Sequence, residues 1–247
     1  MEKRILLTVA YDGSDYFGWQ AQKNPEQPTV QEALQAACEA LFGQPVECTG
    51  ASRTDRGVHA LGQRGTIWVD TSIPAEKIPF ALNTYLPESI AVTAAEAVPE
   101  GFHPRYDVKD KLYRFRIYNA PHRNPLLRKY AEWVCRPLDA GAMHRAAQAL
   151  VGRHDFAAFR AMGSAAKTTV RTIFEISVER REDEVQIFVR GDGFLYNMVR
   201  IIAGTLIAVG QGKMPEDEVA RILASKDRTR AGKTAGPEGL TLMEIRY

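Results

Sequence analysis

The chain has 247 residues, of which 45% are hydrophobic and 25% charged, and this composition excludes a disordered or low-complexity protein. Its 32 basic and 30 acidic residues leave a net charge of +2, so the overall charge indicates no particular partner. No apolar run reaches the roughly 18 residues that a membrane-spanning helix needs. Three widely spaced cysteines (Cys38, Cys48 and Cys135) favour neither a disulfide framework nor a zinc site. We therefore expect a reduced, cytoplasmic protein with no membrane segment.

The first half of the chain alternates strands and helices. Short apolar runs that end at turn residues predict strands at Ile5–Ala10, Val46–Thr49, Gln63–Val69 and Ile90–Glu96. One helix follows a capping box at residues 29–32 and ends at Gly43. A second helix opens at Pro74, with Ile78 and Tyr85 on its apolar face. The resulting order, β-α-β-β-α-β, is the ferredoxin-like motif.

The second half repeats this order more loosely. Strands are predicted at Lys109–Tyr118, Tyr130–Cys135, Thr169–Arg180, Glu184–Arg190 and Leu240–Ile245, and helices at Ala140–Leu150 and Leu195–Val209. We expect an α+β fold of two ferredoxin-like halves, with a mixed, mainly antiparallel sheet flanked by helices. The predicted halves are residues 1–103 and 104–247.

Positive charge is concentrated in two segments. Residues 103–130 hold eight Lys or Arg against two Asp, and residues 226–233 hold four against one. Such clusters bind polyanions by releasing their counterions. The alternative is a pair of solvated basic faces, and charge alone does not choose between the two interpretations.

The loop at residues 50–60 carries the first candidate for chemistry. Asp55 lies between Arg53 and Arg56, and neighbouring cations keep a carboxylate ionised and available as a nucleophile or an anchor. An Asp in a loop is also a common turn former or surface ion pair, so the loop alone leaves both roles open.

A second candidate is Arg200, the only charged residue in Leu195–Val209, which is apolar nearly all round and therefore predicted to be buried. A buried guanidinium is costly unless it is paired, and Asp55 and Asp192 are the obvious carboxylates. The alternative is a structural arginine that binds a loop carbonyl.

Tyr113 is the third candidate. In the strand Lys109–Tyr118 it shares the apolar face with Phe115 and Ile117, close to Lys111, where a planar base could stack on it. A core or rim tyrosine is the alternative.

No motif for a metal or a cofactor was found. The five histidines do not pair with one another or with cysteine at ligand spacing. Gly232-Lys233-Thr234 resembles the end of a phosphate-binding loop, but Asp227 stands where its first glycine belongs. We expect neither a metal nor a cofactor.

Together these segments resemble the bacterial tRNA pseudouridine synthase A family, and the likeness runs through nearly the whole chain. The motifs that carry it include Tyr11-Asp12-Gly13-Ser14, Gly18-Trp19-Gln20-Ala21-Gln22, Thr29-Val30-Gln31, Lys111-Leu112-Tyr113-Arg114-Phe115 and Gly193-Phe194-Leu195-Tyr196-Asn197-Met198-Val199-Arg200. The most specific one is Arg53–Ala60, which is similar to the family's active-site loop. The chain departs from the family's pattern at a few positions, among them Arg56 and Gly236, the second of which interrupts a usual Ala-Pro.

This resemblance implies isomerisation of uridine to pseudouridine at positions 38, 39 and 40 of the tRNA anticodon stem-loop. Asp55 would be the nucleophile, at C6 of the base or C1′ of the ribose, and Arg200 would pair with it. Tyr113 would stack on the flipped uracil, and Arg53 would help to hold that base out of the helix. The resemblance further implies a homodimer that binds tRNA without a cofactor.

Two other functions remain open at this point. A non-catalytic RNA-binding protein with ferredoxin-like halves would use exposed sheet aromatics and would not need Asp55. A related pseudouridine synthase could act with the same chemistry on a different RNA.

Overall fold

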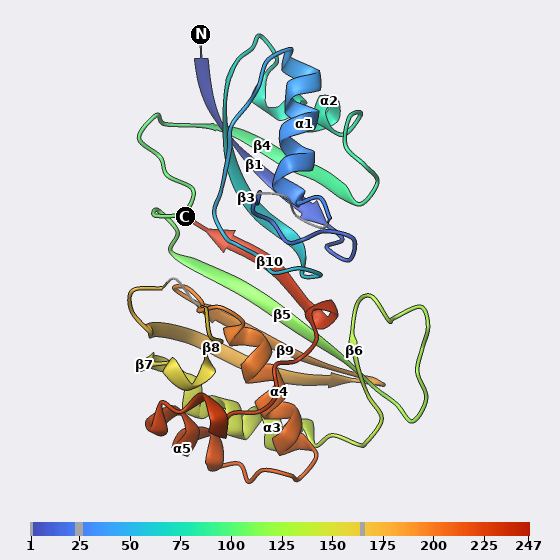
Figure 1. The fold of residues 1–247 in the computed structure, drawn as a ribbon, viewed down its shortest axis with the longest axis vertical. Helices are drawn as coiled ribbons and strands as arrows, with labels where there is room; N and C mark the ends of the chain where they lie inside the picture. The colour runs from blue at the N-terminus through green and yellow to red at the C-terminus, as the bar shows by residue number, and fades with distance from the viewer. Residues whose placement is uncertain (1, 23–26, 164–165) are drawn as a thin grey trace. The chain divides into compact units, whose positions relative to one another are not determined.

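The computed structural model describes residues 2–22, 27–163 and 166–247, and the chain divides into two compact units (Figure 1). Unit 1 contains Met1–Lys109 and Leu242–Tyr247, and unit 2 contains Asp110–Thr241. This division differs from the expected halves by six residues at the boundary and by the C-terminal strand, which returns to unit 1. Most of β10 (Leu240–Arg246) belongs to unit 1, where it is paired with a strand of that unit.

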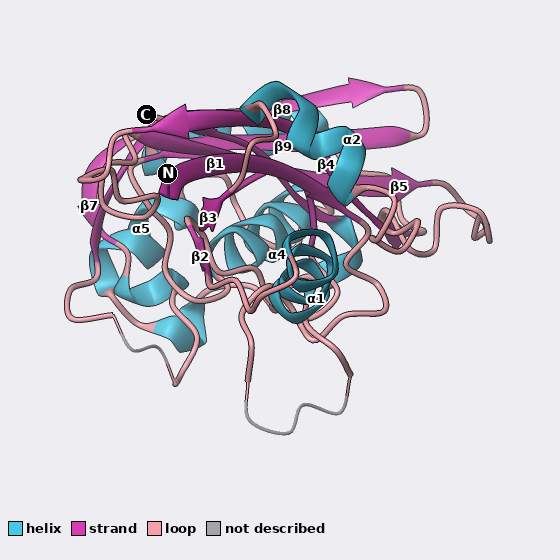
Figure 2. Ribbon diagram, turned by 90° about the horizontal axis from the view of Figure 1, so that it is seen from above, coloured by secondary structure: helices cyan, strands magenta, loops and turns pink. Residues whose placement is uncertain are grey.

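Unit 1 has the predicted order β-α-β-β-α-β. Its elements are β1 (Glu2–Tyr11), α1 (Val30–Phe42), β2 (Cys48–Gly50), β3 (His59–Asp70), α2 (Ile78–Leu82) and β4 (Ile90–Val98). The sheet runs β4-β1-β3-β10, with the short β2 also paired to β3, and the pairs of β1 with β3 and with β4 are antiparallel. Helix α1 lies along one face of these strands (Figure 2).

Helix α1 forms where the sequence predicts it. The Thr29 side chain accepts from the Glu32 N–H at 3.3 Å, and the Glu32 carboxylate accepts from the Thr29 N–H at 2.8 Å, so the capping box is complete. Gly43 ends the helix in the left-handed conformation, at φ 71°. Burial raises the pKa of the Cys38 thiol on the buried face to about 12, which keeps this thiol unreactive.

Two elements of unit 1 differ from their predicted form. Strand β3 begins at His59 rather than Gln63, which shortens the preceding loop to residues 51–58. The helix after Pro74 is one 3-10 turn followed by the five residues of α2, and Tyr85 is 51% exposed. Asn83 follows α2 with a helical backbone, and its side-chain amide exchanges two hydrogen bonds with the Val92 backbone, at 2.8 and 3.0 Å.

Unit 2 also alternates strands and helices, and it has more elements than unit 1. Its elements are β5 (Asp110–Asn119), β6 (Glu132–Val134), α3 (Ala140–Ala147), β7 (Gly152–Asp155), β8 (Val170–Arg181), β9 (Glu184–Gly191), α4 (Met198–Gly210) and α5 (Glu218–Ser225). The sheet order is β5-β9-β8-β7, antiparallel throughout, and β6 adds to β5 in parallel. Strand β7 and helix α5, which are four and eight residues long, were not predicted from the sequence. The predicted α+β class, with a mainly antiparallel sheet and flanking helices, is confirmed.

Helix α4 is the buried helix that its apolar composition predicts. Eleven of its thirteen residues are buried, and a Cβ on Gly204 would lie 1.9 Å from the Lys233 carbonyl oxygen, so only glycine allows the segment around Lys233 to cross here. The helix begins three residues later than predicted, because Asn197 adopts a left-handed φ of 58°. Among the described residues, no helix has the length and apolarity to cross a membrane.

Candidate active site

Asp55 lies in the loop of residues 51–58, which joins β2 to β3 in unit 1. Ser52, Thr54 and Val58 are buried, and Asp55 is half-buried. Arg53, like Arg56, is exposed to solvent. The loop therefore has a buried base and a charged, accessible tip, as a reactive loop on a rigid sheet requires.

The segment before α1 holds this loop from one side. The Trp19 N–H donates to the Thr54 carbonyl at 3.1 Å, and the Tyr11 and Thr54 hydroxyls are hydrogen-bonded at 2.7 Å in a buried contact. Gly18 has a φ of +83°, and a Cβ there would lie 2.5 Å from the Thr54 oxygen. The backbone next to Asp55 is thus fixed by close packing that only glycine permits at position 18.

Strand β3 holds the loop from the other side through Gln63, which is fully buried. The amide of Gln63 donates to the Ser52 carbonyl at 2.7 Å and accepts from the Ser52 N–H at 3.3 Å and the Arg64 N–H at 3.1 Å. The Gly13 N–H donates to Nδ1 of His59 at 3.1 Å, at the far end of the loop. Neither Gly13 nor Gln63 was singled out for a positioning role from the sequence.

Arg200 lies in the first turn of α4 and is half-buried. Its Nε donates to the Ala235 carbonyl at 2.7 Å, and its Nη1 donates to Oδ1 of Asn197 at 2.7 Å. This is the loop-carbonyl role that was left open as an alternative. Asp192, the other proposed partner, accepts from the Thr172 N–H at 2.9 Å. The pairing of Arg200 with Asp55 stays a prediction.

Tyr113 is 5% exposed on β5, and it shares its buried face with Phe115 and Ile117 as predicted. Its ring makes an edge-to-face contact with Phe194, with centroids 5.1 Å apart and planes at 84°. Phe194 comes from the motif that leads into α4, so this contact joins the motif at Lys111–Phe115 to the motif at Gly193–Arg200 within unit 2. Stacking of Tyr113 on a base stays a prediction.

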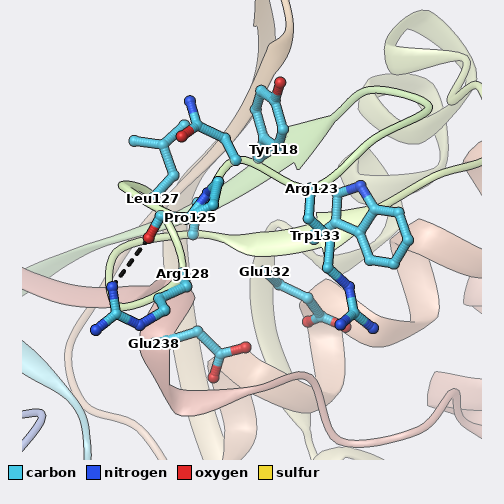
Figure 3. Close-up of a pocket in the computed structure, with 10 residues that line it drawn as sticks. Tyr118, Arg123, Pro125, Leu127, Arg128, Glu132, Trp133 and Glu238 are labelled. Carbon is cyan, nitrogen blue, oxygen red and sulfur yellow. Dashed lines mark hydrogen bonds between the residues drawn. The ribbon is translucent and has the colours of Figure 1, made fainter.

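A pocket of about 540 Å³ lies elsewhere in unit 2, beside Trp133 (Figure 3). Its lining includes none of the four predicted site residues, Asp55, Arg200, Tyr113 and Arg53. Among the described residues, no three His, Cys, Asp or Glu side chains are grouped so that they could hold a metal ion.

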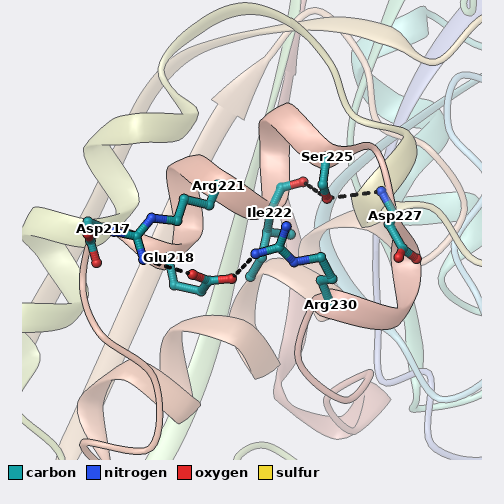
Figure 4. Close-up of polar contacts among 7 residues, drawn as sticks. All are labelled: Asp217, Glu218, Arg221, Ile222, Ser225, Asp227 and Arg230. Atoms are coloured by element: carbon teal, nitrogen blue, oxygen red, sulfur yellow. Dashed lines mark hydrogen bonds and ion pairs between the residues drawn. The ribbon is translucent and has the colours of Figure 1, made fainter.

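The basic cluster at 226–233 is largely neutralised by carboxylates from distant parts of unit 2. Lys226 pairs with Asp155 at 3.0 Å, and Lys233 pairs with Glu132 at 2.8 Å. Figure 4 shows the Glu218 carboxylate between Arg221 and Arg230, and the hydrogen bond from Arg230 holds the pKa of Glu218 below its ordinary value. These contacts favour a structural role for this cluster.

The segment 103–130 also exposes fewer cations than its count of eight Lys and Arg residues suggests. Arg116 forms a two-point ion pair with Glu184, whose pKa is lowered chiefly by that hydrogen bond. Burial, followed by repulsion from Arg116, lowers the pKa of Arg114. The exposed cations of this segment are Arg105, Lys109, Arg123 and Arg128.

The Arg116–Glu184 pair predicts acid sensitivity of unit 2. Because the folded-state pKa of Glu184 is depressed, its stabilisation is present above the unfolded pKa of about 4.3 and is lost as the pH falls through the folded pKa. Glu184→Gln is expected to lower the free energy of unfolding by about 1 kcal/mol at pH 7 and to flatten its decline between about pH 5 and pH 3. Urea unfolding across this pH range measures both effects. Glu182→Gln, an exposed site in the same hairpin turn, is the control; equal pH slopes for the two variants contradict the prediction.

Comparison with known proteins gives the class first. A family model described as "tRNA pseudouridine synthase" matches residues 7–107 and 146–247, and pseudouridine synthases are isomerases. A "tRNA pseudouridine synthase A" of Thermoanaerobacter sp. (strain X514) is 49% identical over 245 residues, covering 99% of this chain and 100% of the relative. The protein of the same name from Brevibacillus brevis is 47% identical over 247 residues, with the same coverage. The chain therefore belongs to the tRNA pseudouridine synthase A family and is an enzyme.

A solved Cbf5-Nop10-Gar1 complex is similar in structure with a TM-score of 0.35 and 14% identity, over 82% of this chain and 45% of that chain. This likeness is too low to bear on the assignment, which rests on the sequence relatives.

Proposed function

We propose that this enzyme isomerises uridine to pseudouridine at positions 38, 39 and 40 of the anticodon stem-loop of tRNA. The observation that carries the proposal is near-complete coverage of relatives named tRNA pseudouridine synthase A at 49% identity. The local geometry supports it, because the loop most similar to the family's active-site loop is held on both sides while its tip stays accessible.

In the proposed reaction, the Asp55 carboxylate attacks either C6 of the uracil or C1′ of the ribose. The bond between N1 and C1′ breaks, the base rotates, and C5 forms the new bond to C1′. The Asp55 carboxylate is released, displaced from C1′ by C5 or eliminated from C6, so the enzyme is regenerated. The proton on C5 is lost and N1 gains one, so the reaction is an isomerisation with no net redox change. An ionised, accessible carboxylate is the group that this chemistry needs from the protein.

Three other residues complete the proposed site. Arg200 pairs with Asp55 and keeps it ionised. Tyr113 stacks on the uracil and assists removal of the C5 proton. Arg53, which is exposed at the tip of the loop, helps to hold the uridine out of the RNA stack, because an enzyme that acts on a base must extrude it.

The partner in this proposal is tRNA, bound by a homodimer in the cytoplasm so that one tRNA contacts both subunits. The support for the dimer is the family resemblance, and sedimentation of the purified protein with and without tRNA measures it.

Position-resolved mapping tests the substrate. With unmodified tRNA transcripts that carry uridine at 38, 39 or 40, chemical mapping is expected to find pseudouridine at those positions. The matched control is the same transcript with cytidine there, in which no pseudouridine is expected. Modification at another position with these sites left unchanged would identify a synthase of the same chemistry with a different target.

A further inference from the structure

The pocket beside Trp133 is lined by none of the residues of the proposed active site. It is formed mainly by the crossover that joins β5 to β6, together with Glu238 (Figure 3). Residues 118–133 fall between the two stretches that the family model matches. At about 540 Å³, the pocket is within the range of about 300–1,000 Å³ typical of small-molecule sites.

One wall of the pocket is a flat cationic platform. The Arg123 guanidinium lies over the Trp133 ring, with its Cζ 4.8 Å from the ring centroid. The Trp133 Nε1–H donates to the Ala120 carbonyl at 2.9 Å, which fixes the indole and therefore the plane of the stack. Arg123 is exposed, so the outer face of its guanidinium is accessible to a further planar group. Bases of unpaired RNA stack on surfaces of this kind.

The pocket is also lined by the carboxylate of Glu238. The Glu238 carboxylate lies against Gly236, where a Cβ would come within 2.3 Å of both of its oxygens. Gly236 is one of the residues at which the chain departs from the family's pattern. The neighbouring Glu132 is already occupied, by Lys233 at 2.8 Å and the Gly236 N–H at 3.1 Å. Glu238 is therefore the carboxylate that can bind a ligand.

A second guanidinium completes the lining. Nη1 of Arg128 donates to the Pro125 carbonyl at 3.0 Å, which anchors the side chain and leaves its other N–H groups for an anion. In the view of Figure 3, Arg128 and the Arg123–Trp133 stack lie on opposite sides of Glu238. The pocket thus combines a stacking surface, an acceptor for N–H donors and a donor for phosphate.

We propose that this pocket binds one guanine nucleotide. The base stacks on Arg123, its N1–H and 2-amino groups donate to Glu238, and its phosphate accepts from Arg128. Guanine is selected because it presents two adjacent donors to one carboxylate, whereas uracil, adenine and cytosine each present a single donor group. The nucleotide comes from an unpaired part of the RNA substrate or from the free pool; the RNA source rests on the proposed function.

Binding of mononucleotides to the full chain tests the site without catalysis. Guanosine 5′-monophosphate is expected to bind at least about tenfold more tightly than uridine 5′-monophosphate, and Glu238→Gln is expected to remove that preference. Arg123→Lys keeps the charge but loses the planar surface, and it is expected to weaken both nucleotides. Glu76→Gln, an exposed carboxylate in unit 1, is the control and should change neither.

Kinetic assays with tRNA identify the source of the bound nucleotide. If the nucleotide belongs to the substrate, Glu238→Gln lowers kcat/KM for tRNA severalfold and Glu76→Gln does not. Selective binding of guanosine monophosphate with unchanged kcat/KM assigns the site to the free nucleotide. No guanine preference together with unchanged kcat/KM overturns the proposal and leaves the proposed function intact, since the enzyme still makes pseudouridine. If the Glu238→Gln or Arg123→Lys variants lose a dimer instead, with no change in nucleotide binding, the face is a protein contact and the proposal fails.

Discussion

Asp55→Asn is expected to abolish pseudouridine formation while tRNA still binds. The substitution keeps the size of the side chain and its capacity to accept hydrogen bonds, but an amide cannot serve as the nucleophile. The loop should keep its shape, because the hydrogen bonds made by Thr54, Ser52 and Val58 do not depend on the charge of the Asp55 side chain. Single-turnover assays with excess enzyme, alongside a tRNA binding measurement, separate the two effects.

Asp55→Glu extends this test to geometry. It keeps the charge but moves the carboxylate by about one bond length, beyond the roughly 0.5 Å that catalytic constellations tolerate, so it should also fail. Asp183→Asn removes an exposed carboxylate from the β8–β9 turn and serves as the control with normal turnover. Measurable pseudouridine formation by purified Asp55→Asn would contradict the assignment of Asp55 as the nucleophile.

The elements that the sequence predicted well are those specified by local chemistry. The capping box at Thr29, the glycine at position 43 and the apolar composition of α4 each act within a few residues, and all three appear in the structure as expected. The helix predicted after Pro74 is present in a shorter form, and the Asn83 side chain at its end bonds to the Val92 backbone in β4. Propensity along the chain carries no information on such a contact.

The number of unpaired cations was the property least predictable from the sequence, because ion pairs also depend on tertiary contacts. The partner of Arg116 is Glu184, 68 residues away, and the partner of Lys233 is Glu132, 101 residues away. Counting charges within a segment therefore overstated the cations available to RNA. Pairing of this kind depends on strand register: β5 and β9 place Arg116 opposite Gln186, two residues from Glu184.

The candidate site was predictable in part. The loop of Asp55 stood out because its residue types are unusual together, but its anchors did not, since Gln63 is one polar residue within a strand pattern. The motif around Gly13 and Gly18 was recognised by likeness, and the structure gives its physical cause. Both glycines let the backbone approach the Asp55 loop to distances that a Cβ would prevent.

Arg200→Met is expected to damage both activity and stability, and the two losses can be separated. If Arg200 pairs with Asp55, removing the cation raises the pKa of the carboxylate, so the acidic limb of the kcat profile moves up by about 1–3 pH units. Activity lost at pH 6 should then return in part as the pH rises. Stability should fall by about 1–3 kcal/mol, because the variant also loses the hydrogen bonds to Ala235 and Asn197.

Asn197→Gly is the matched control for the structural part. Glycine adopts the left-handed conformation of Asn197 at no steric cost but removes the oxygen that binds Nη1 of Arg200. It is expected to lower the melting temperature without moving the acidic limb, because the cation stays. A limb that stays in place in Arg200→Met, with wild-type kcat between pH 5 and 8, would show that Arg200 does not pair with Asp55. Its role would then be the one its hydrogen bonds already describe, closing the segment at Ala235 onto the start of α4.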